Sequence, residues 1–370
     1  MKEYSIKLIA HDILPAITHI VNLSIRDGIF SRSWKSAKVV PLLKKDDPLN
    51  PKNYRPVALL PVLSKILERA VLQQLVGYLD HNGILHPNHH GSRKGHSTAT
   101  ALIQMYDVWT KAVDEGNMVG VMMIDLSAAF DMVDHGILLA KLEILGLDLQ
   151  ALQWVDSYLA GRTQCVCVDG QLSPLMDVKY GVPQGSVLGP LLYILFTNDL
   201  PDIIHTGGEH GDPNLHGRPC GGLVTYVDDG TCSIVERDPV KLSSTLSEKY
   251  RAIKDYMVKN KLVINADKTP LVVMGSRAAN RARQAVCMKA GDFIIHPSDT
   301  EKLLGCNIHQ NLRWKAHIQT GENSLIKKSN KEGQCFTQGV YKCYIQDQAC
   351  SYQWSIQVNT KLPSPCLGWV

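Results

Sequence analysis

The stretch LVTYVDDGTCSIV, residues 223–235, places two adjacent carboxylates at the bend of a short β-hairpin. Apolar and small residues on either side predict two brief strands, with Asp228 and Asp229 at the turn between them. Neighbouring carboxylates repel each other, so a cation commonly binds where a protein puts them together. Magnesium suits such a place because it prefers carboxylate oxygens and substrate phosphates. The alternative is a solvated hairpin turn, since Asp-Asp-Gly is also favourable turn chemistry.

A third carboxylate, Asp125, ends a second predicted strand. The run MVGVMMI, residues 118–124, is apolar throughout, as expected of a central strand buried on both faces. An acid at the end of such a strand is costly unless it is paired or binds a metal ion. The following LSAAFD predicts a helix start with Ser127 as a possible cap. Two strands could therefore bring acids to one point, the arrangement that two-metal phosphoryl or nucleotidyl transfer requires. The alternative is that Asp125 only ends a strand before a helix.

These motifs, taken together, resemble a known family. The run GVPQGSVLGPLL at residues 181–192 lies between DLSAAFDMVD at residues 125–134 and the YVDD turn. In this order they resemble the reverse transcriptase of LINE-type, non-LTR retrotransposons. Further similar blocks are WKSAKVVPLLKKDDPLNPKNYRPVALL (residues 34–60), GSRKGHSTATAL (91–102), NKLVINADKT (260–269) and LLGCNIHQNLRWKAH (303–317). The likeness runs in the family's order from about Ile13 to about Lys328.

The resemblance implies an α+β, right-hand polymerase fold, with a central antiparallel palm sheet, helices behind it, fingers, and a truncated or divergent thumb. The implied divisions are an N-terminal helical extension (1–33), fingers (34–117), palm with interleaved fingers elements (118–300), a palm–thumb junction (301–328) and a divergent, poorly ordered tail (329–370). Within them, apolar spacing predicts helices over 62–79, 98–112, 135–159, 186–198 and 239–260. A further helical pattern over 6–29 is predicted to be interrupted or kinked by Pro15.

The resemblance also implies roles for single residues. Asp125, Asp228 and Asp229 would hold two Mg²⁺ ions, with Mn²⁺ a possible substitute, and Lys268 would protonate the leaving pyrophosphate. Phe130 would select deoxynucleotides, Gln184 would face the nucleotide, Gly185 would permit close approach to it, and Arg55 would grip the triphosphate. Arg93 and Lys94 would touch the template. The implied substrates are an RNA template, a DNA primer and deoxynucleoside triphosphates. Phe130 could instead be a core aromatic, and Lys268 a surface lysine beside a turn.

The composition is compatible with the resemblance to a reverse transcriptase but does not by itself indicate that function. The chain has 370 residues, 45% of them hydrophobic, with a formal net charge of +4. Basic residues gather between Arg32 and Arg55, where a phosphate backbone or plain solvent could face them. The ten cysteines form no Cys-x-x-Cys pair, and the longest apolar run, residues 187–196, is too short to span a bilayer. No secretory signal opens the chain. We therefore expect a reduced, intracellular protein without a membrane anchor, in the nucleus, the cytoplasm or both.

The family pattern is not followed throughout. Ser92 and Val227 stand where an aromatic residue and an alanine are usual, and the likeness stops at about Lys328. Two hypotheses of different class therefore stay open: an RNA-directed DNA polymerase module, and a catalytically inactive, truncated remnant that at most binds nucleic acid. An intron maturase or a telomerase-like enzyme would share the acidic triad, but the fingers block and DLSAAFDMVDH argue against that reading.

Overall fold

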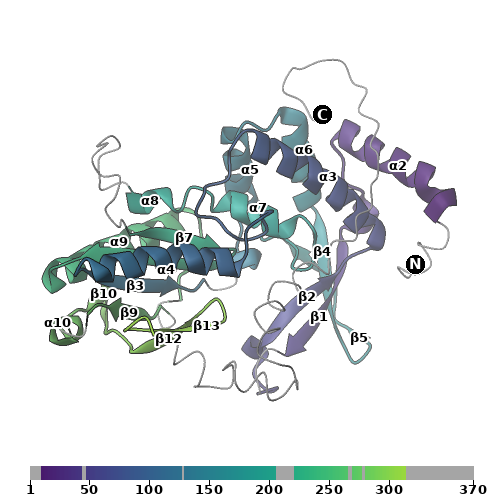
Figure 1. The fold of residues 1–370 in the computed structure, drawn as a ribbon. Helices are drawn as coiled ribbons and strands as arrows, with labels where there is room; N and C mark the ends of the chain where they lie inside the picture. Colours follow the sequence, from purple (N-terminus) through teal and green to yellow (C-terminus); the bar gives the residue numbers. More distant parts are fainter. Residues whose placement is uncertain are drawn as a thin grey trace, which may run out of the picture.

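Two β-sheets organise the computed structural model of the chain (Figure 1). It describes residues 10–43, 47–126, 129–205, 221–265, 269–276 and 280–313. The predicted tail over 329–370 and the end of the predicted junction lie outside this range. Among the described residues, no helix is both long and apolar enough to cross a membrane.

The first sheet, which we call the palm sheet, is four-stranded and has the order β7-β8-β3-β9. All of its neighbouring strands are antiparallel. Its strands are β3 (Met118–Ile124), β7 (Gly222–Tyr226), β8 (Asp229–Glu236) and β9 (Leu271–Met274). Every residue of β3 is buried, as the uninterrupted apolar run predicted.

Both faces of the palm sheet are covered. Met118, Met122 and Ile124 point into the larger core, which α9 (Pro239–Lys259) covers. The alternate residues Val119, Val121 and Met123 pack in a second core with α4 (Thr98–Asp114) and the hairpin of β12 (Thr300–Leu303) and β13 (Cys306–His309). Strand alternation explains this division. The sheet edge that carries the acidic residues is thus held by a rigid, two-sided core.

The second sheet, the fingers sheet, has the order β2-β1-β4-β5, with β6 also paired to β4. β1 and β2 are antiparallel, whereas β1 and β4 are parallel. Its strands are β1 (Ser36–Leu43), β2 (Tyr54–Leu59), β4 (Arg162–Val168), β5 (Gln171–Leu172) and β6 (Met176–Val178). As expected for interleaved elements, β4 comes from the predicted palm and pairs with a strand of the predicted fingers. The domain boundaries themselves stay predictions.

The remaining helices mostly surround the larger core. They are α2 (Ala10–Asp27), α3 (Val62–His81), α5 (His135–Ile144), α6 (Leu149–Leu159), α7 (Gly189–Phe196), α8 (Asp202–His205) and α10 (Asn280–Gln284). Short 3₁₀ turns are η1 (Arg32–Trp34), η2 (Pro51–Asn53) and η3 (Ala129–Asp131), and β10 (Met288–Ala290) pairs with β11 (Phe293–Ile295).

Two helical segments differ in detail from the prediction. The predicted helix over 135–159 is two helices, because Gly146 adopts a left-handed φ of 88° between α5 and α6 and Asp148 caps the second. Pro15 was predicted to interrupt or kink the N-terminal helix; α2 continues through Pro15, so the helix is not interrupted there. The predicted helix start at Ser127 falls just outside the described residues, and the chain resumes in η3.

A buried carboxylate joins α3 to α7. Glu68 is fully buried and accepts hydrogen bonds from the Ser64 hydroxyl (2.8 Å), the Val187 amide (2.7 Å) and the Tyr158 hydroxyl (3.3 Å). A buried charge is tolerated when such donors surround it. Glu68 also sits at the N-terminal end of α7, where an anion is favoured. It therefore fixes the start of α7, the helix that lies beneath the acidic edge.

Candidate active site

The YVDD turn and the end of β3 bring two carboxylates to one cavity. Tyr226 pairs with Asp229 across the two-residue turn, and Ile124 of β3 pairs with Gly230 of β8. Asp125, which follows Ile124, is consequently a close neighbour of Asp229. Both acids line a cavity of about 250 Å³ together with Gly230, Pro270 and Lys302. Separate strands thus bring Asp125 and Asp229 to one place, while Asp228 occupies the exposed tip of the turn.

The turn holds a strained residue. Val227 has a φ of +57°, at the first turn position, where hairpins favour glycine. A β-branched residue is rare in this left-handed region. Such strain persists only where the surroundings enforce it.

A segment of the chain before α4 provides that enforcement. The Thr225 amide donates to the carbonyl of Asn88 (3.0 Å), and the His90 amide donates to the carbonyl of Thr225 (2.9 Å). His89 is buried, donates from Nε2 to the carbonyl of Thr197 (3.1 Å) and accepts at Nδ1 from the Thr225 hydroxyl. Gly91 completes this contact, because a Cβ built there would lie 2.6 Å from the Val227 nitrogen. We call residues 88–91 the clamp segment, since it holds the acidic turn from the side of β7.

The acidic residues lie above an aromatic pair formed by Tyr193 and Phe130. Tyr193 of α7 is buried and stacks on Phe130, with ring centroids 4.9 Å apart. Burial raises the pKa of the Tyr193 hydroxyl, and the negative charges of Asp228 and Asp229 raise it further. The tyrosine therefore stays neutral beneath the two carboxylates. Phe130 is half-buried, so one part of its ring remains accessible beside the site.

The Pro-Gln-Gly turn connects the palm to the fingers sheet. The Gln184 carbonyl accepts from the Ala58 amide of β2 (2.8 Å), and Gly185, at a φ of +106°, would bring a Cβ to 2.8 Å from the Ala58 carbonyl oxygen. In the structure, Gly185 is thus required for the approach of this turn to β2. On its other side, the Gln184 side-chain amide donates to the Asp131 carboxylate at 2.9 Å.

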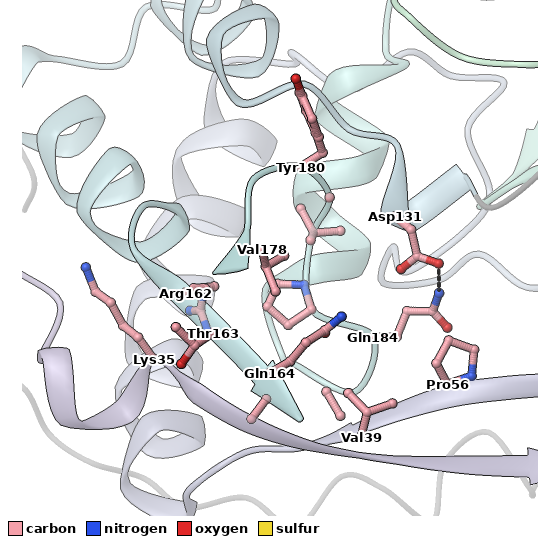
Figure 2. Close-up of a pocket in the computed structure, with 15 residues that line it drawn as sticks. Lys35, Val39, Pro56, Asp131, Arg162, Thr163, Gln164, Val178, Tyr180 and Gln184 are labelled. Carbon is pink, nitrogen blue, oxygen red and sulfur yellow. Dashed lines mark hydrogen bonds between the residues drawn. The ribbon is translucent and has the colours of Figure 1, made fainter. Parts of the chain in front are cut away.

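Gln184 and Asp131 line a second cavity, of about 220 Å³, beneath the fingers sheet (Figure 2). Pro56 and Ala58 of β2 line it as well. Because strand side chains alternate, Arg55 points to the opposite face of β2 from these two residues. The structure therefore does not bring Arg55 and Gln184 into the same cavity.

The remaining predicted residues are scattered. Arg93 is half-buried, and its Nη1 donates to the carbonyl of His86 (3.3 Å), whereas Lys94 beside it is exposed. Both lie a few residues after the clamp segment. Lys268 lies outside the described residues.

The acidic residues suit a hard divalent cation by their chemistry. Carboxylate oxygens are the donors that magnesium prefers, and Asp125 and Asp229 face one water-accessible cavity. Within the described part of the chain, no three histidine, cysteine or acidic side chains lie close enough together to hold an ion by themselves. An ion at this edge would therefore draw further oxygen ligands from water or substrate, as magnesium commonly does.

Two residues of the site were missed by the sequence reasoning. Tyr193 carries the sole polar side-chain group in the buried helix GPLLYILF. A single hydroxyl in such an apolar sequence could have marked Tyr193 as a residue of the site. Lys302 lines the cavity of Asp125 and Asp229 from β12, and no local pattern marks it.

Comparisons with known proteins identify the family. A family model described as reverse transcriptase (RNA-dependent DNA polymerase) matches residues 42–308. The chain therefore belongs to the reverse transcriptase family, whose members use divalent metal ions and act on an RNA template and a DNA primer. This confirms the resemblance drawn from the motifs.

The similar curated proteins include RNA-directed DNA polymerases of mobile elements. The chain is 29% identical over 353 residues to the RNA-directed DNA polymerase from mobile element jockey of Drosophila funebris, covering 92% of the chain and 37% of that protein. The jockey polymerase of Drosophila melanogaster is 30% identical over 325 residues, covering 88% and 34%. The chain thus spans about a third of the length of these relatives. It is a reverse transcriptase domain homologous to those of non-LTR retrotransposons.

Solved structures agree on the fold. A telomerase of Candida tropicalis truncated from its C-terminal domain superposes with a TM-score of 0.51 at 14% identity, over 77% of this chain and 55% of that one. At this identity the likeness concerns the fold alone. It supports the predicted right-hand polymerase fold of the α+β class.

Proposed function

We propose that this chain is the polymerase module of a non-LTR retrotransposon and extends a DNA primer along an RNA template. The observation that carries the proposal is the meeting of Asp125 and Asp229 at one cavity, beside Asp228 on the same turn. Family membership supports the reaction class, and the geometry supports the placement of the acids. Deoxynucleoside triphosphates are the proposed second substrate.

In the proposed reaction, the primer 3′-oxygen attacks the α-phosphorus and the bond to pyrophosphate breaks. Asp125, Asp228 and Asp229 would hold two Mg²⁺ ions, or Mn²⁺ in their place. Metal bound there would lower the pKa of the primer hydroxyl and neutralise the triphosphate and the leaving pyrophosphate. The neutral Tyr193 beneath the turn supports the acids without competing for the cation.

The remaining roles concern binding. Phe130, stacked on Tyr193 with one part exposed, is proposed to lie under the incoming sugar and exclude a 2′-hydroxyl. Gln184 and Gly185 are proposed to form the nucleotide side of the site at its boundary with the fingers. Arg55, on the other face of β2, is proposed to grip the triphosphate, because guanidinium suits phosphate oxygens. Arg93 and Lys94 are assigned to the template, and Lys268 to protonation of pyrophosphate.

Primer extension tests the proposed function. The full chain, an RNA template with an annealed DNA primer, deoxynucleotides and Mg²⁺ should give elongated products. Asp228→Ala should reduce incorporation at least about a thousandfold, because metal ions supply several kcal/mol of transition-state stabilisation. Chelation of divalent ions should stop the reaction of the unmodified chain.

Asp107→Ala is the matched control, since it removes an exposed carboxylate on α4 away from the turn. Equal incorporation by the unmodified chain and Asp228→Ala would overturn the assigned site. A folded chain that binds RNA in a salt-sensitive manner and incorporates nothing would instead be the inactive remnant.

A further inference from the structure

The Pro-Gln-Gly turn is fixed against the residues that follow Phe130. The Val182 amide donates to the carbonyl of Phe130, and the Gly181 amide donates to the carbonyl of Val133, both at 2.8 Å. Gly181 allows this approach, because a Cβ there would lie 2.7 Å from the Asp131 Cα. The backbone therefore sets how far the Asp131 and Gln184 side chains can lie from each other.

Between these side chains runs one hydrogen bond. Gln184 Nε2 donates to Asp131 Oδ2 at 2.9 Å, as Figure 2 shows. Gln184 is half-buried, whereas Asp131 is open to solvent on one side. Within the described part of the chain, the Asp131 carboxylate accepts its side-chain hydrogen bond from Gln184. The pair lines the cavity below the fingers sheet.

We propose that Asp131 is a positioning residue that sets which end of the Gln184 amide faces the substrate. An ionised carboxylate only accepts hydrogen bonds, so it selects the amide orientation that turns the NH₂ group toward it. The Gln184 carbonyl oxygen Oε1 is then left to accept a hydrogen bond from a hydroxyl or amino group of the incoming nucleotide. A hydrogen bond to a charged partner holds this orientation more firmly than a neutral one. The proposal deepens the proposed function and rests on it.

The orientation matters because an amide can present either a donor or an acceptor. With Asp131 in place, one of these two possibilities is excluded before the nucleotide arrives. Loss of the carboxylate would let the amide rotate, so part of the chains would offer the wrong group. The expected effect falls on nucleotide affinity, since Asp131 touches neither the acidic turn nor the reacting atoms in the described contacts.

Single-nucleotide incorporation kinetics test this proposal. Asp131→Ala should raise the KM for the deoxynucleotide roughly tenfold, with kcat within about threefold of the unmodified chain. Asp131→Asn should keep KM within about threefold, because the oxygen of the introduced amide can still accept from Gln184. Gln184→Glu should raise KM by more than tenfold, since it places a second carboxylate beside Asp131.

The double variant is the decisive arm. Asp131→Asn in the Gln184→Glu background should restore most of the lost affinity, because the introduced amide can donate to the introduced carboxylate. Rescue of KM without a matching change in thermal stability separates positioning of the amide from a role in folding alone. Asp177→Ala, on the exposed strand β6, is the control for loss of a nearby carboxylate and should leave KM unchanged. Thermal unfolding of each variant checks that the chain is folded.

Unchanged KM in Asp131→Ala, or a double variant no better than Gln184→Glu, would overturn the proposal. Failure of the proposed function gives a different result, namely no incorporation by the unmodified chain. In that case, equilibrium binding of a fluorescent deoxynucleotide to the same variants tests the pair without turnover. Equal affinity across the series there would equally contradict the role of Asp131.

Discussion

At the scale of single residues, the acidic turn depends on the Cβ atom that Gly91 lacks and on the strained backbone of Val227. The Val227 amide and one of its methyl groups occupy the space that a Gly91 Cβ would need. The clamp segment and the turn are therefore fitted to each other, and neither can be changed alone. The position of the carboxylates at the turn therefore depends on the contact between Gly91 and Val227.

Gly91→Ala is expected to lower the free energy of unfolding by about 2 kcal/mol, the usual cost of overpacking. Incorporation should fall as well, because the added methyl group pushes against the backbone that carries Asp228. Gly77→Ala is the matched control: a Cβ there meets nothing within 4 Å on helix α3. The control should stabilise the chain by about 0.5–1 kcal/mol. Denaturant unfolding and primer extension measure both, and a Gly91→Ala chain as stable as the unmodified one would contradict the fitted contact.

His89 gives the clamp segment a pH dependence. Burial lowers its pKa to about 4, so the folded chain keeps the imidazole neutral while the unfolded chain takes up a proton near pH 6.5. The unfolded state then binds more protons between these values, and the free energy of unfolding falls as the pH drops through this window. Between neutral pH and a pH below both pKa values, protonation of His89 should lower the free energy of unfolding by about 3 kcal/mol in total.

Denaturant unfolding of the unmodified chain and of His89→Gln at pH 7.5 and pH 5 measures this contribution. We expect the variant to be less stable at pH 7.5 and the gap between the two chains to shrink at pH 5. A gap that is the same at both pH values would show that His89 does not titrate between the folded and unfolded states.

At the scale of elements, helix α5 begins at a charged N-cap residue, Asp134, which also forms an ion pair. Asp134 accepts from the Ile137 amide (3.0 Å) as the N-cap of α5 and pairs with Lys261 at 2.6 Å. The hydrogen bond from Lys261, and then that from Ile137, hold the pKa of the Asp134 carboxyl below its ordinary value. Its stabilisation is therefore present above about pH 4 and is lost as the pH falls below that value.

Asp134→Ala should lower the free energy of unfolding by about 1 kcal/mol at pH 7, the usual effect of losing an N-cap. Asp134→Asn should cost less, since asparagine also caps helices and only the ion pair is lost. The difference between the unmodified chain and Asp134→Ala should narrow at pH 3. Denaturant unfolding at both pH values measures it, and a difference that grows on acidification would contradict the sign of the pKa shift.

Elements with a local signal were predictable, and elements set by distant contacts were not. The run at 118–124 was readable as a strand because buried strands are apolar without interruption. The break between α5 and α6 was missed because apolar residues continue across Gly146, whose left-handed backbone ends the helix. The pairing of β4 with β1 carries no local signature, since parallel register depends on residues more than a hundred positions apart.

At the scale of the whole molecule, the candidate active site shows the same difference between residues with a local sequence signal and residues placed by distant contacts. Asp125, Asp228 and Asp229 could be found because each lies in a short motif at a strand end. Tyr193, Lys302 and the partnership of Asp131 with Gln184 arise only when α7, β12 and the Pro-Gln-Gly turn meet in space. The face occupied by Arg55 likewise follows from the register of β2, which the sequence does not determine.

The parallel pairing of β1 with β4 has a consequence for how the chain folds during its synthesis on the ribosome. Strand β1 is synthesised early, yet its parallel neighbour emerges only after the whole of α3, α4, β3, α5 and α6. Long-range pairing of this kind is slow, because loop closure must precede any gain from contact. We expect the nascent β1–β2 ribbon to wait with one edge unpaired while the ribosome adds the intervening helices. A chaperone that binds exposed strand edges would protect it during that interval.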